Sequence, residues 1–353
     1  MNIATANLTS SNKLTPLSDP VESASSGEHQ RRFTFKIAKT PVAVRLAVAL
    51  IVVAAALAIA RGPVAVGQTT LNGLVAAGYF SLGAVGLTLV FGALRIINFA
   101  HGDLLTLGAY LTLGMTSLGL PFWPAAAVAI AATAGVALLL DWVVWEPVRR
   151  QRANALQLFL VAIGLAMVIR YTIQFFAGSQ PRSVGQNVLS TIAVGPFHLG
   201  TLQALALVVG VAAVSLVGLG LAFTRFGKQI RALADDMALA EVSGVDTRAM
   251  VRLVWLVAGG LAALAGVLYA AAVGSVNPNF GFLILLSLFT AAVLGGIGNA
   301  YGALTGGLIV GLTQEWSTLF FNARWKPVVG FAILILVLLV MPRGIFGSGR
   351  ARS

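Results

Sequence analysis

Residues 253–314 read LVWLVAGGLAALAGVLYAAAVGSVNPNFGFLILLSLFTAAVLGGIGNAYGALTGGLIVGLTQ, a run of 62 residues without one Asp, Glu, Lys or Arg. A membrane core is about 30 Å thick and takes about 20 apolar residues per helix, so this run is long enough for three crossings. Backbone groups in lipid must pair within the protein, which leaves helices or a closed barrel. Barrel strands alternate polar and apolar residues, whereas this run is apolar on every face. The run therefore predicts membrane-spanning helices.

The composition extends this prediction to the whole chain. Of its 353 residues, 58% are apolar and only 10% are charged, and the mean hydropathy is +0.92. A soluble domain of this size needs more polar residues to cover its surface. The predicted fold class is thus all-α, a polytopic helical membrane bundle.

A net charge of +12 would suggest nucleic acid as the partner of a soluble protein. Here the basic residues lie in a few short loops beside apolar runs, which is the pattern of the positive-inside rule. We therefore expect membrane lipids, and no nucleic acid, as a partner. The chain has no cysteine, which excludes disulfides, thiolate metal ligands and cysteine nucleophiles.

Ten apolar segments follow a polar N-terminal stretch. They are 42–60, 68–92, 99–118, 122–145, 155–177, 199–223, 251–274, 281–294, 301–320 and 327–341. They predict about eight to ten transmembrane helices, and the pair within 281–320 is expected to form two crossings or one broken, re-entrant hairpin. The predicted organisation is a disordered cytoplasmic tail at 1–41, a transmembrane domain at 42–346 and a short C-terminal tail at 347–353.

The basic loops indicate an orientation. When the ten segments alternate from a cytoplasmic N-terminus, most basic residues fall on the cytoplasmic side, including Arg95, Arg149–Arg152, Arg225–Arg252 and the C-terminal end. Arg324 and Lys326 fall on the opposite side, against the trend. We expect a multi-pass protein of the cell inner membrane with both termini in the cytoplasm.

Glycine is abundant, with 39 residues, and many of these lie inside apolar segments. Most are expected to let neighbouring helices approach closely. The dense cluster between Gly295 and Gly307 also predicts a helix break, where freed backbone groups line a cavity.

The most polar stretch between apolar segments in the first half of the chain runs from Arg95 to Asp103. It combines an amide with two ionisable side chains, in Asn98, His101, Gly102 and Asp103. An ionisable residue near the membrane must be hydrated, paired or neutralised, and is therefore a functional candidate. Two alternatives are open: these residues belong to the translocation path or its gate, or they cap the helix that follows.

The longest polar loop, near 225–250, is expected to contain a short amphipathic helix. Its apolar positions recur at three- and four-residue spacing and fall on one face. They are Ile230, Leu233, Met237 and Ala240, while Arg231, Asp235, Asp236 and Glu241 lie elsewhere on the helix. Gly244 is expected to end this helix, and Asp246 or Thr247 to cap the next one. Such a helix either docks a soluble motor protein or lies on the membrane surface.

The sequence shows no motor and no catalytic site. A P-loop needs Gly-x-x-x-x-Gly-Lys-Ser/Thr, and the nearest match has Ala222 for the first glycine and Gln229 for the hydroxyl residue. The metalloprotease and nucleophile-elbow motifs are missing, and the chain has three histidines in all. We predict that the protein is not an enzyme, with no catalytic residue, no metal site and no cofactor of its own.

Four groups of residues follow one another between 68 and 346. The first comprises Leu71-Asn72-Gly73, Ile97 to Asp103 and Gly108-Ala109-Tyr110. The second comprises Glu146-Pro147-Val148-Arg149 and Ile163-Gly164. The third comprises Arg231-Ala232, Asp236, Ala240 and Gly244, and the fourth Gly295 to Gly298, Gly302-Ala303 and Gly306-Gly307. In this order they resemble the LivH-type permeases of branched-chain amino acid ABC importers.

The resemblance implies an ABC importer permease fold in a heteromeric complex. The other members would be a second permease subunit of the LivM type, two cytoplasmic ATP-binding subunits that use the ATP, and a periplasmic or lipid-anchored substrate-binding protein. It also implies that the loop near 225–250 docks the ATPase. The Glu-Ala-Ala triplet of importer permeases reads Ala238-Leu239-Ala240 here. The docking candidates are Ile230, Arg231, Leu233, Asp236, Met237, Ala240 and Gly244.

The function expected from the sequence is that of a membrane-spanning permease subunit, formed by 42–346, that translocates branched-chain or related amino acids with energy from partner ATPases. An ABC permease for urea or short-chain amides is an alternative within the same class. From another class, a proton-coupled secondary transporter would use His101 and Asp103 as a proton relay.

Overall fold

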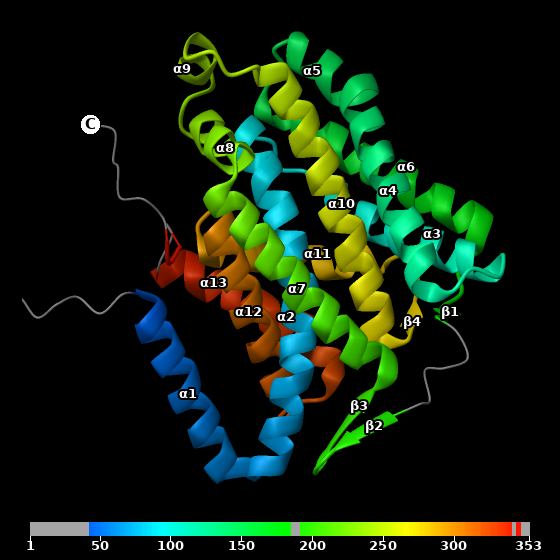
Figure 1. Ribbon diagram of the computed structural model, residues 1–353, viewed down its shortest axis with the longest axis vertical. Helices are drawn as coiled ribbons and strands as arrows, with labels where there is room; N and C mark the ends of the chain where they lie inside the picture. Colours follow the sequence, from blue (N-terminus) through cyan, green and yellow to red (C-terminus); the bar gives the residue numbers. More distant parts are fainter. Residues whose placement is uncertain (1–41, 185–190, 341–343, 347–353) are drawn as a thin grey trace, which may run out of the picture. The chain divides into compact units, whose positions relative to one another are not determined.

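The computed structural model describes residues 42–184, 191–340 and 344–346 (Figure 1). The tails predicted at 1–41 and 347–353 lie outside the described residues. The chain divides into two compact units, Met1–Leu50 and Ile51–Ser353. This boundary falls within the first helix, α1 (Val42–Arg61).

Each of the ten predicted apolar segments coincides with one α-helix of the described residues, to within a few residues at its ends. These helices are α1, α2 (Pro63–Leu94), α3 (His101–Ser117), α4 (Phe122–Leu140), α6 (Ala155–Ala177), α7 (Thr201–Phe223), α10 (Thr247–Val273), α11 (Phe280–Gly295), α12 (Ala300–Ser317) and α13 (Lys326–Val340). The predicted polytopic all-α fold is therefore confirmed.

Within the described residues, seven helical spans are long and apolar enough to cross a membrane. They are Val44–Arg61, Pro63–Leu94, Phe122–Arg150, Ala155–Ala177, Thr201–Phe223, Thr247–Val273 and Ala323–Val340. Helices α3, α11 and α12 have only 17, 16 and 18 residues. Many of their residues are buried among the other helices, so these three need less apolar surface towards lipid.

Shorter elements connect the long helices. They are the π-helical turn η1 (Asp141–Trp145), α5 (Glu146–Arg150), α8 (Arg225–Asp235), α9 (Met237–Val242) and the 3-10 turn η3 (Ala323–Trp325). Two antiparallel strand pairs, not predicted from the sequence, are β1 (Arg182–Ser183) with β4 (Ser275–Val276), and β2 (Thr191–Val194) with β3 (Phe197–Gly200). In Figure 1 these strands lie at the end of the bundle opposite α8 and α9.

Helix α2 forms the centre of the bundle. It runs for 32 residues, and every residue from Val75 to Val90 is buried. A helix that is apolar on all sides is stable when lipid or other helices surround it. Here α12, α10, α7 and α11 pack around α2, which Figure 1 shows in cyan.

The contact between α2 and α12 depends on a glycine. A Cβ atom on Gly307 of α12 would collide with the backbone of Ser81 on α2. The hydroxyl of Ser81 also donates a hydrogen bond to Leu304 O (2.8 Å). Nearer the other end of α12, Trp316 Nε1 donates to Thr70 Oγ1 (2.9 Å). Small residues and interhelical hydrogen bonds of this kind are what hold membrane helices together.

The predicted helix break between α11 and α12 is confirmed. Gly296 and Gly298 have φ angles of 101° and 89°, a left-handed backbone that favours glycine. Asn299 then caps α12, because its side-chain oxygen accepts hydrogen bonds from the N–H groups of Tyr301 and Gly302 (both 3.1 Å). The two helices are thus separated by a short turn.

We expect Gly307→Leu to separate α2 from α12 and to lower the stability of the folded protein by about 1–3 kcal/mol or more, the usual effect of overpacking. Thermal unfolding of the purified protein in detergent measures this. Gly114→Leu on α3 is the matched control, since a Cβ there meets no atom within 4 Å. Equal unfolding temperatures for both variants would contradict the tight α2–α12 contact.

Candidate functional site

The polar stretch that ends at Asp103 turns into the bundle rather than facing water. Arg95, at the end of α2, has a left-handed backbone with φ 57°. The side-chain oxygen of Asn98 accepts a hydrogen bond from the N–H of Ala100 (3.1 Å), so Asn98 shapes the turn before α3. The side chains of Asn98, His101 and Asp103 are all buried. Burial requires each of them to find a partner inside the protein.

His101 pairs with the backbone of α2. Its Nε2 lies 2.9 Å from the carbonyl oxygen of Gly83, which can only accept, so Nε2 carries the proton. The ring fits because Gly86 has no side chain, and a Cβ there would lie 2.9 Å from His101 Cε1. His101 therefore fastens α3 to α2 and makes no cap for α3.

Asp103 pairs with Arg170, which the sequence analysis did not select. Arg170 donates from Nε to Asp103 Oδ1 (2.9 Å) and from Nη2 to Oδ2 (3.0 Å). The same guanidinium lies over the ring of Phe282, 4.5 Å from its centroid. This bidentate ion pair neutralises a carboxylate that is fully buried. Together with the contact to Phe282, it links α3, α6 and α11.

Gly102 allows α11 to cross α3. A Cβ on Gly102 or on Gly281 would collide with the backbone of the other residue. The N–H of Gly281 donates to Thr106 Oγ1 (3.2 Å), which fixes the start of α11 against α3. The four predicted gate residues thus lie in the bundle interior, at contacts between α3 and its neighbours. A role in gating stays a prediction.

The Asp103–Arg170 pair should show the behaviour of a buried ion pair. Asp103→Ala leaves Arg170 buried without a counter-charge and should destabilise the protein by about 3–5 kcal/mol. The double variant Asp103→Leu with Arg170→Met should regain much of that stability, because no charge then remains to be buried. Unfolding temperatures in detergent compare the three proteins. A single variant as stable as the natural chain would rule out the buried pair.

The segment predicted as one amphipathic helix forms two, α8 and α9, so that prediction is wrong. Asp236 separates them with extended backbone (φ −155°, ψ 110°). Its side-chain oxygen accepts hydrogen bonds from the N–H groups of Ala238 (2.9 Å) and Leu239 (3.0 Å). Aspartate is among the best N-cap residues, and its capping of α9 competes with continuation of α8.

The end of this segment follows the prediction. Gly244 comes just after α9 and has a left-handed φ of 87°. Asp246 caps α10, since its side-chain oxygen accepts from the N–H of Ala249 (2.9 Å). Arg231 Nη1 donates to the carbonyl oxygen of Leu221 (2.6 Å), which ties α8 to α7. Both ends of the segment are therefore fixed to long helices.

The apolar face of α8 points into the bundle. Ile230 and Leu233 of α8 and Ala240 of α9 are buried, with 6%, 2% and 3% of their surfaces exposed. Their side chains pack within the chain itself, which removes them from the surface open to a partner. Of the four apolar positions predicted to share one face, only Met237 is exposed.

The exposed apolar surface of the segment belongs to α9. Leu239 and Val242 are 65% and 87% exposed, and Met237 lies on the same short helix. Leu239 and Val242 are neighbours on one side of α9, and Met237 lies on another side, in the wall of a cavity. We call these three residues the α9 patch. Sequence periodicity missed Leu239 and Val242, because they do not share the spacing of the buried face. Exposed apolar side chains beside charged residues are typical of a protein–protein contact.

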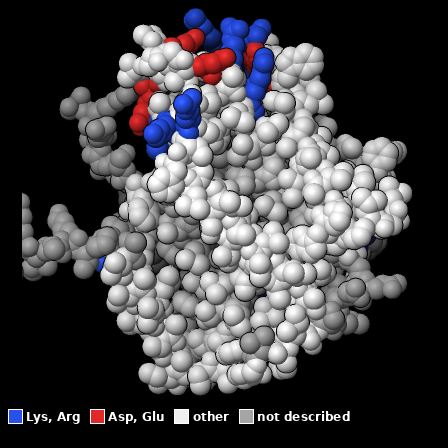
Figure 2. Space-filling view, viewed as in Figure 1, with Lys and Arg blue, Asp and Glu red and all other residues white. Residues whose placement is uncertain are grey.

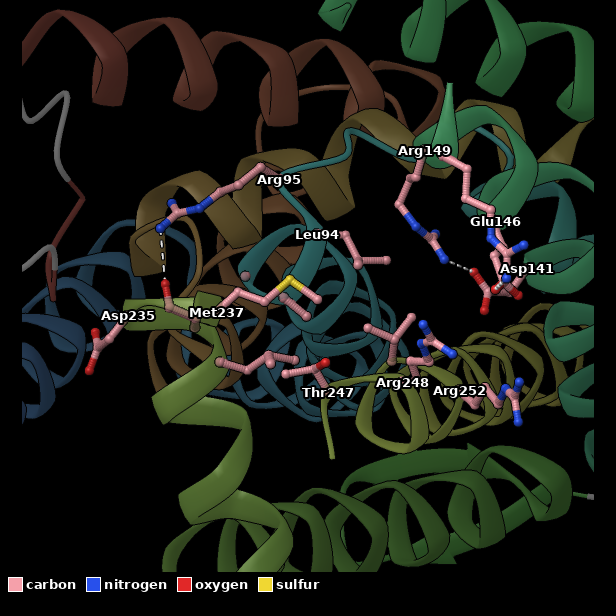
Figure 3. Close-up of a pocket in the computed structure, with 16 residues that line it drawn as sticks. Leu94, Arg95, Asp141, Glu146, Arg149, Asp235, Met237, Thr247, Arg248 and Arg252 are labelled. Atoms are coloured by element: carbon pink, nitrogen blue, oxygen red, sulfur yellow. Dashed lines mark hydrogen bonds and ion pairs between the residues drawn. The ribbon is translucent and has the colours of Figure 1, made fainter. Parts of the chain in front are cut away.

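A cavity of about 540 Å³ adjoins α8 and α9 (Figure 3). Its wall includes five arginines and three carboxylates: Arg95, Arg149, Arg150, Arg248, Arg252, Asp141, Glu146 and Asp235. Arg149 pairs with Asp141 (2.7 Å), and Arg95 Nη2 donates to the carbonyl oxygen of Ala234 (3.0 Å). Figure 3 shows Met237 and Leu94 between Arg95 and Arg149.

Charged residues gather at this end of the bundle. Figure 2 shows Lys, Arg, Asp and Glu clustered over the region of α5, α8 and α9, while the rest of the visible face is almost free of them. One cavity is lined by Arg95, Arg149 and Arg248. These residues belong to basic loops that were predicted to lie on the same side of the membrane. A large uncharged body below one charged end is what a membrane-embedded bundle requires.

These features define a multi-pass helical membrane protein. Ion pairs link its buried helices, and a short helical segment lies between two crossings at its charged end. Transport permeases are built in this way. The chain belongs to the family of permease components of branched-chain amino acid transport systems. The family model "Branched-chain amino acid transport system / permease component" matches residues 69–338. The family resemblance inferred from the sequence is thereby confirmed.

Similar proteins support the same family. The chain is 33% identical to the "High-affinity branched-chain amino acid transport system permease protein LivH" of Escherichia coli (strain K12), over 79% of this chain and 95% of that protein. It is 31% identical to the corresponding BraD protein of Pseudomonas aeruginosa, with the same coverage. A solved structure, "PsaBC from Streptococcus pneumoniae in complex with Fab", is 16% identical, with a TM-score of 0.44 over 80% of this chain and 94% of that chain. That structural likeness is too weak to establish a shared fold.

Proposed function

We propose that this chain is the membrane-spanning permease subunit of an ATP-driven importer that carries branched-chain amino acids across the cell inner membrane. The observation that carries the proposal is the family match over residues 69–338, which spans the bundle from α2 to α13. The names of the LivH and BraD relatives favour branched-chain amino acids over urea or short-chain amides as the substrate.

The proposed complex contains a second permease subunit of the LivM type, two ATP-binding subunits and a periplasmic or lipid-anchored binding protein. The chain has no P-loop of its own, so ATP would be used by the partner subunits. The charged end would face the cytoplasm by the positive-inside rule, with both termini on that side. The ATP-binding subunits would then meet α8, α9 and the cavity beside them.

The α9 patch is the proposed contact for the ATP-binding subunits, in place of the apolar face that the sequence suggested. Met237, Leu239 and Val242 are exposed at the charged end of the bundle, where charged side chains surround them and favour a protein partner. A short helix with exposed apolar side chains fits a groove on a soluble partner. Arg231, Asp236 and Gly244 contribute by fixing the position of α9, through the contacts described above.

The geometry gives no support to a proton relay through His101 and Asp103. His101 Nε2 faces Gly83 O on α2, while Asp103 is engaged by Arg170 of α6. A relay needs both groups to exchange protons along one path. Asn98, His101, Gly102 and Asp103 are proposed instead to hold α3 in place while the bundle changes state.

Uptake measurements test the proposed function. The complete complex in liposomes should accumulate radiolabelled leucine only when ATP is supplied to the ATP-binding subunits, and a protonophore should leave the rate unchanged. Uptake that needs a proton gradient and ignores ATP would overturn the proposal. Competition by urea or acetamide at equal concentration would favour the alternative substrate class.

The α9 patch predicts which substitutions release the ATP-binding subunits. Leu239→Asp with Val242→Asp should reduce their co-purification by about tenfold or more, since losing two buried apolar side chains at an interface removes about 3 kcal/mol. Gln151→Asp adds a charge at an exposed position after α5, outside α8 and α9, and is the control.

Leu233→Asp is expected to behave differently from these variants. Because Leu233 is buried in the bundle, this change should lower the amount of folded chain in the membrane rather than release a partner. Co-purification unaffected by the two α9 substitutions would exclude the docking role.

A further inference from the structure

A second cavity, of about 430 Å³, lies at the other end of the bundle. Its wall includes Gln203 in the first turn of α7 and Ala272 and Val273 at the end of α10. Helix α8 follows the far end of α7, and α9 precedes the start of α10, so this cavity is separated from the α8–α9 end by the length of those helices (Figure 1). The remaining wall comes from α2, α11, α12, η3 and α13.

The cavity wall contains an ion pair. Glu315 in the last turn of α12 lies 2.6 Å from Lys326 at the start of α13. The side chains are 11% and 30% exposed, so Glu315 is largely buried and Lys326 is the more open of the two, and both line the cavity. Charged side chains inside a membrane bundle are rare and are typical of a path for a polar substrate.

The rest of the wall divides into a polar part and an apolar part. Near the ion pair, Gln314 Nε2 donates to Ser287 Oγ (2.8 Å), so these two side chains already satisfy each other. Tyr79 and Tyr269 stand edge to face with ring centroids 5.4 Å apart. Apolar side chains complete the wall, among them Val75, Phe80, Leu283 and Ile284. Such a mixture is typical of a ligand site, and the volume falls in the usual range of about 300–1,000 Å³.

We propose that this cavity binds the transported amino acid as a zwitterion, with Glu315 facing its α-ammonium group and Lys326 its α-carboxylate group. This inference rests on the proposed function. In a free amino acid the α-ammonium and α-carboxylate groups are attached to the same carbon atom, so a carboxylate and an ammonium side chain held side by side can meet both groups at once. The aliphatic side chain would then lie against Val75, Phe80 and Ile284, where it leaves water.

The Glu315–Lys326 pair keeps the proposed site neutral both when it is empty and when it is filled. An empty cavity with one unpaired charge would be costly inside the bundle, whereas Glu315 and Lys326 neutralise each other before the substrate arrives. A zwitterion adds one charge of each sign, so the site remains neutral when it is filled. A urea or simple amide substrate has no such pair of charges and gains nothing from the two side chains.

Charge reversal distinguishes a substrate site from a structural bridge. The complete complex in liposomes is assayed for ATP-dependent leucine uptake with Glu315→Gln, Lys326→Gln, Lys326→Arg and the double variant Glu315→Lys with Lys326→Glu. Either neutral variant should lower uptake by about tenfold or more, the factor expected when one charge-assisted hydrogen bond is lost. Lys326→Arg should retain most of the uptake, because the positive charge remains.

The double variant restores an ion pair with the opposite polarity. Its complex should unfold at nearly the natural temperature in detergent but should not recover uptake, because the pocket for the aliphatic side chain fixes which end of the substrate meets each charge. Arg324→Gln is the control, since it removes a positive charge two residues from Lys326 and does not line the cavity. That variant should transport normally.

The outcomes separate the two proposals. If the natural complex transports leucine with ATP and the reversed pair transports equally well, the zwitterion site is wrong and the proposed function stands. Neutral variants with normal uptake lead to the same conclusion. If the natural complex does not transport leucine at all, the proposed function fails and the substrate site fails with it.

Discussion

The backbone contact between α2 and α12 is the interaction on which the other features depend. Because Gly307 has no side chain, the two helices approach until Ser81 touches the α12 backbone. This contact sets the position of Glu315, further along α12, beside the cavity that we assign to the substrate. The other end of α2 leads through Arg95 to the turn before His101. In lipid the hydrophobic effect does little to bring helices together. Close packing and hydrogen bonds between the helices have to hold them in contact instead.

Most of the fold could be predicted from local sequence patterns. A membrane-spanning helix is defined by the hydropathy of its own residues, so each of the ten predicted segments coincides with a helix to within a few residues at its ends. Gly296, Gly298 and Gly244 mark backbone turns, and Asp246 marks a helix start, for equally local reasons. The β1–β4 pair could not be predicted, because its pairing joins residues as far apart as Arg182 and Val276. The β2–β3 pair is a local hairpin whose strands have only four residues each, too short for a clear alternating pattern.

The site depends on contacts between distant parts of the chain, which sequence patterns do not contain. Asp103 was selected as an ionisable residue, but its partner Arg170 lies 67 positions away. Arg170 could have been suspected, because it is the single charged residue in the apolar segment 155–177 and a charge inside the membrane needs a partner. In α8, the periodic spacing identified an apolar face correctly and gave no information on what covers it. The bundle covers Leu233, and the open surface is the α9 patch.

Two long helices connect the opposite ends of the molecule. Helix α2 contributes Asn72 to the cavity that we assign to the substrate, and Leu94 to the charged cavity. Helix α10 does the same with Ala272 and Arg252 at its two ends. With 27 residues it spans about 40 Å. Helix α9 joins α10 through the turn at Gly244. If an ATP-binding subunit docks on α9 as proposed, tilting α9 would move the wall of the distant cavity through α10, and ATP binding would then favour one state of that cavity over the other.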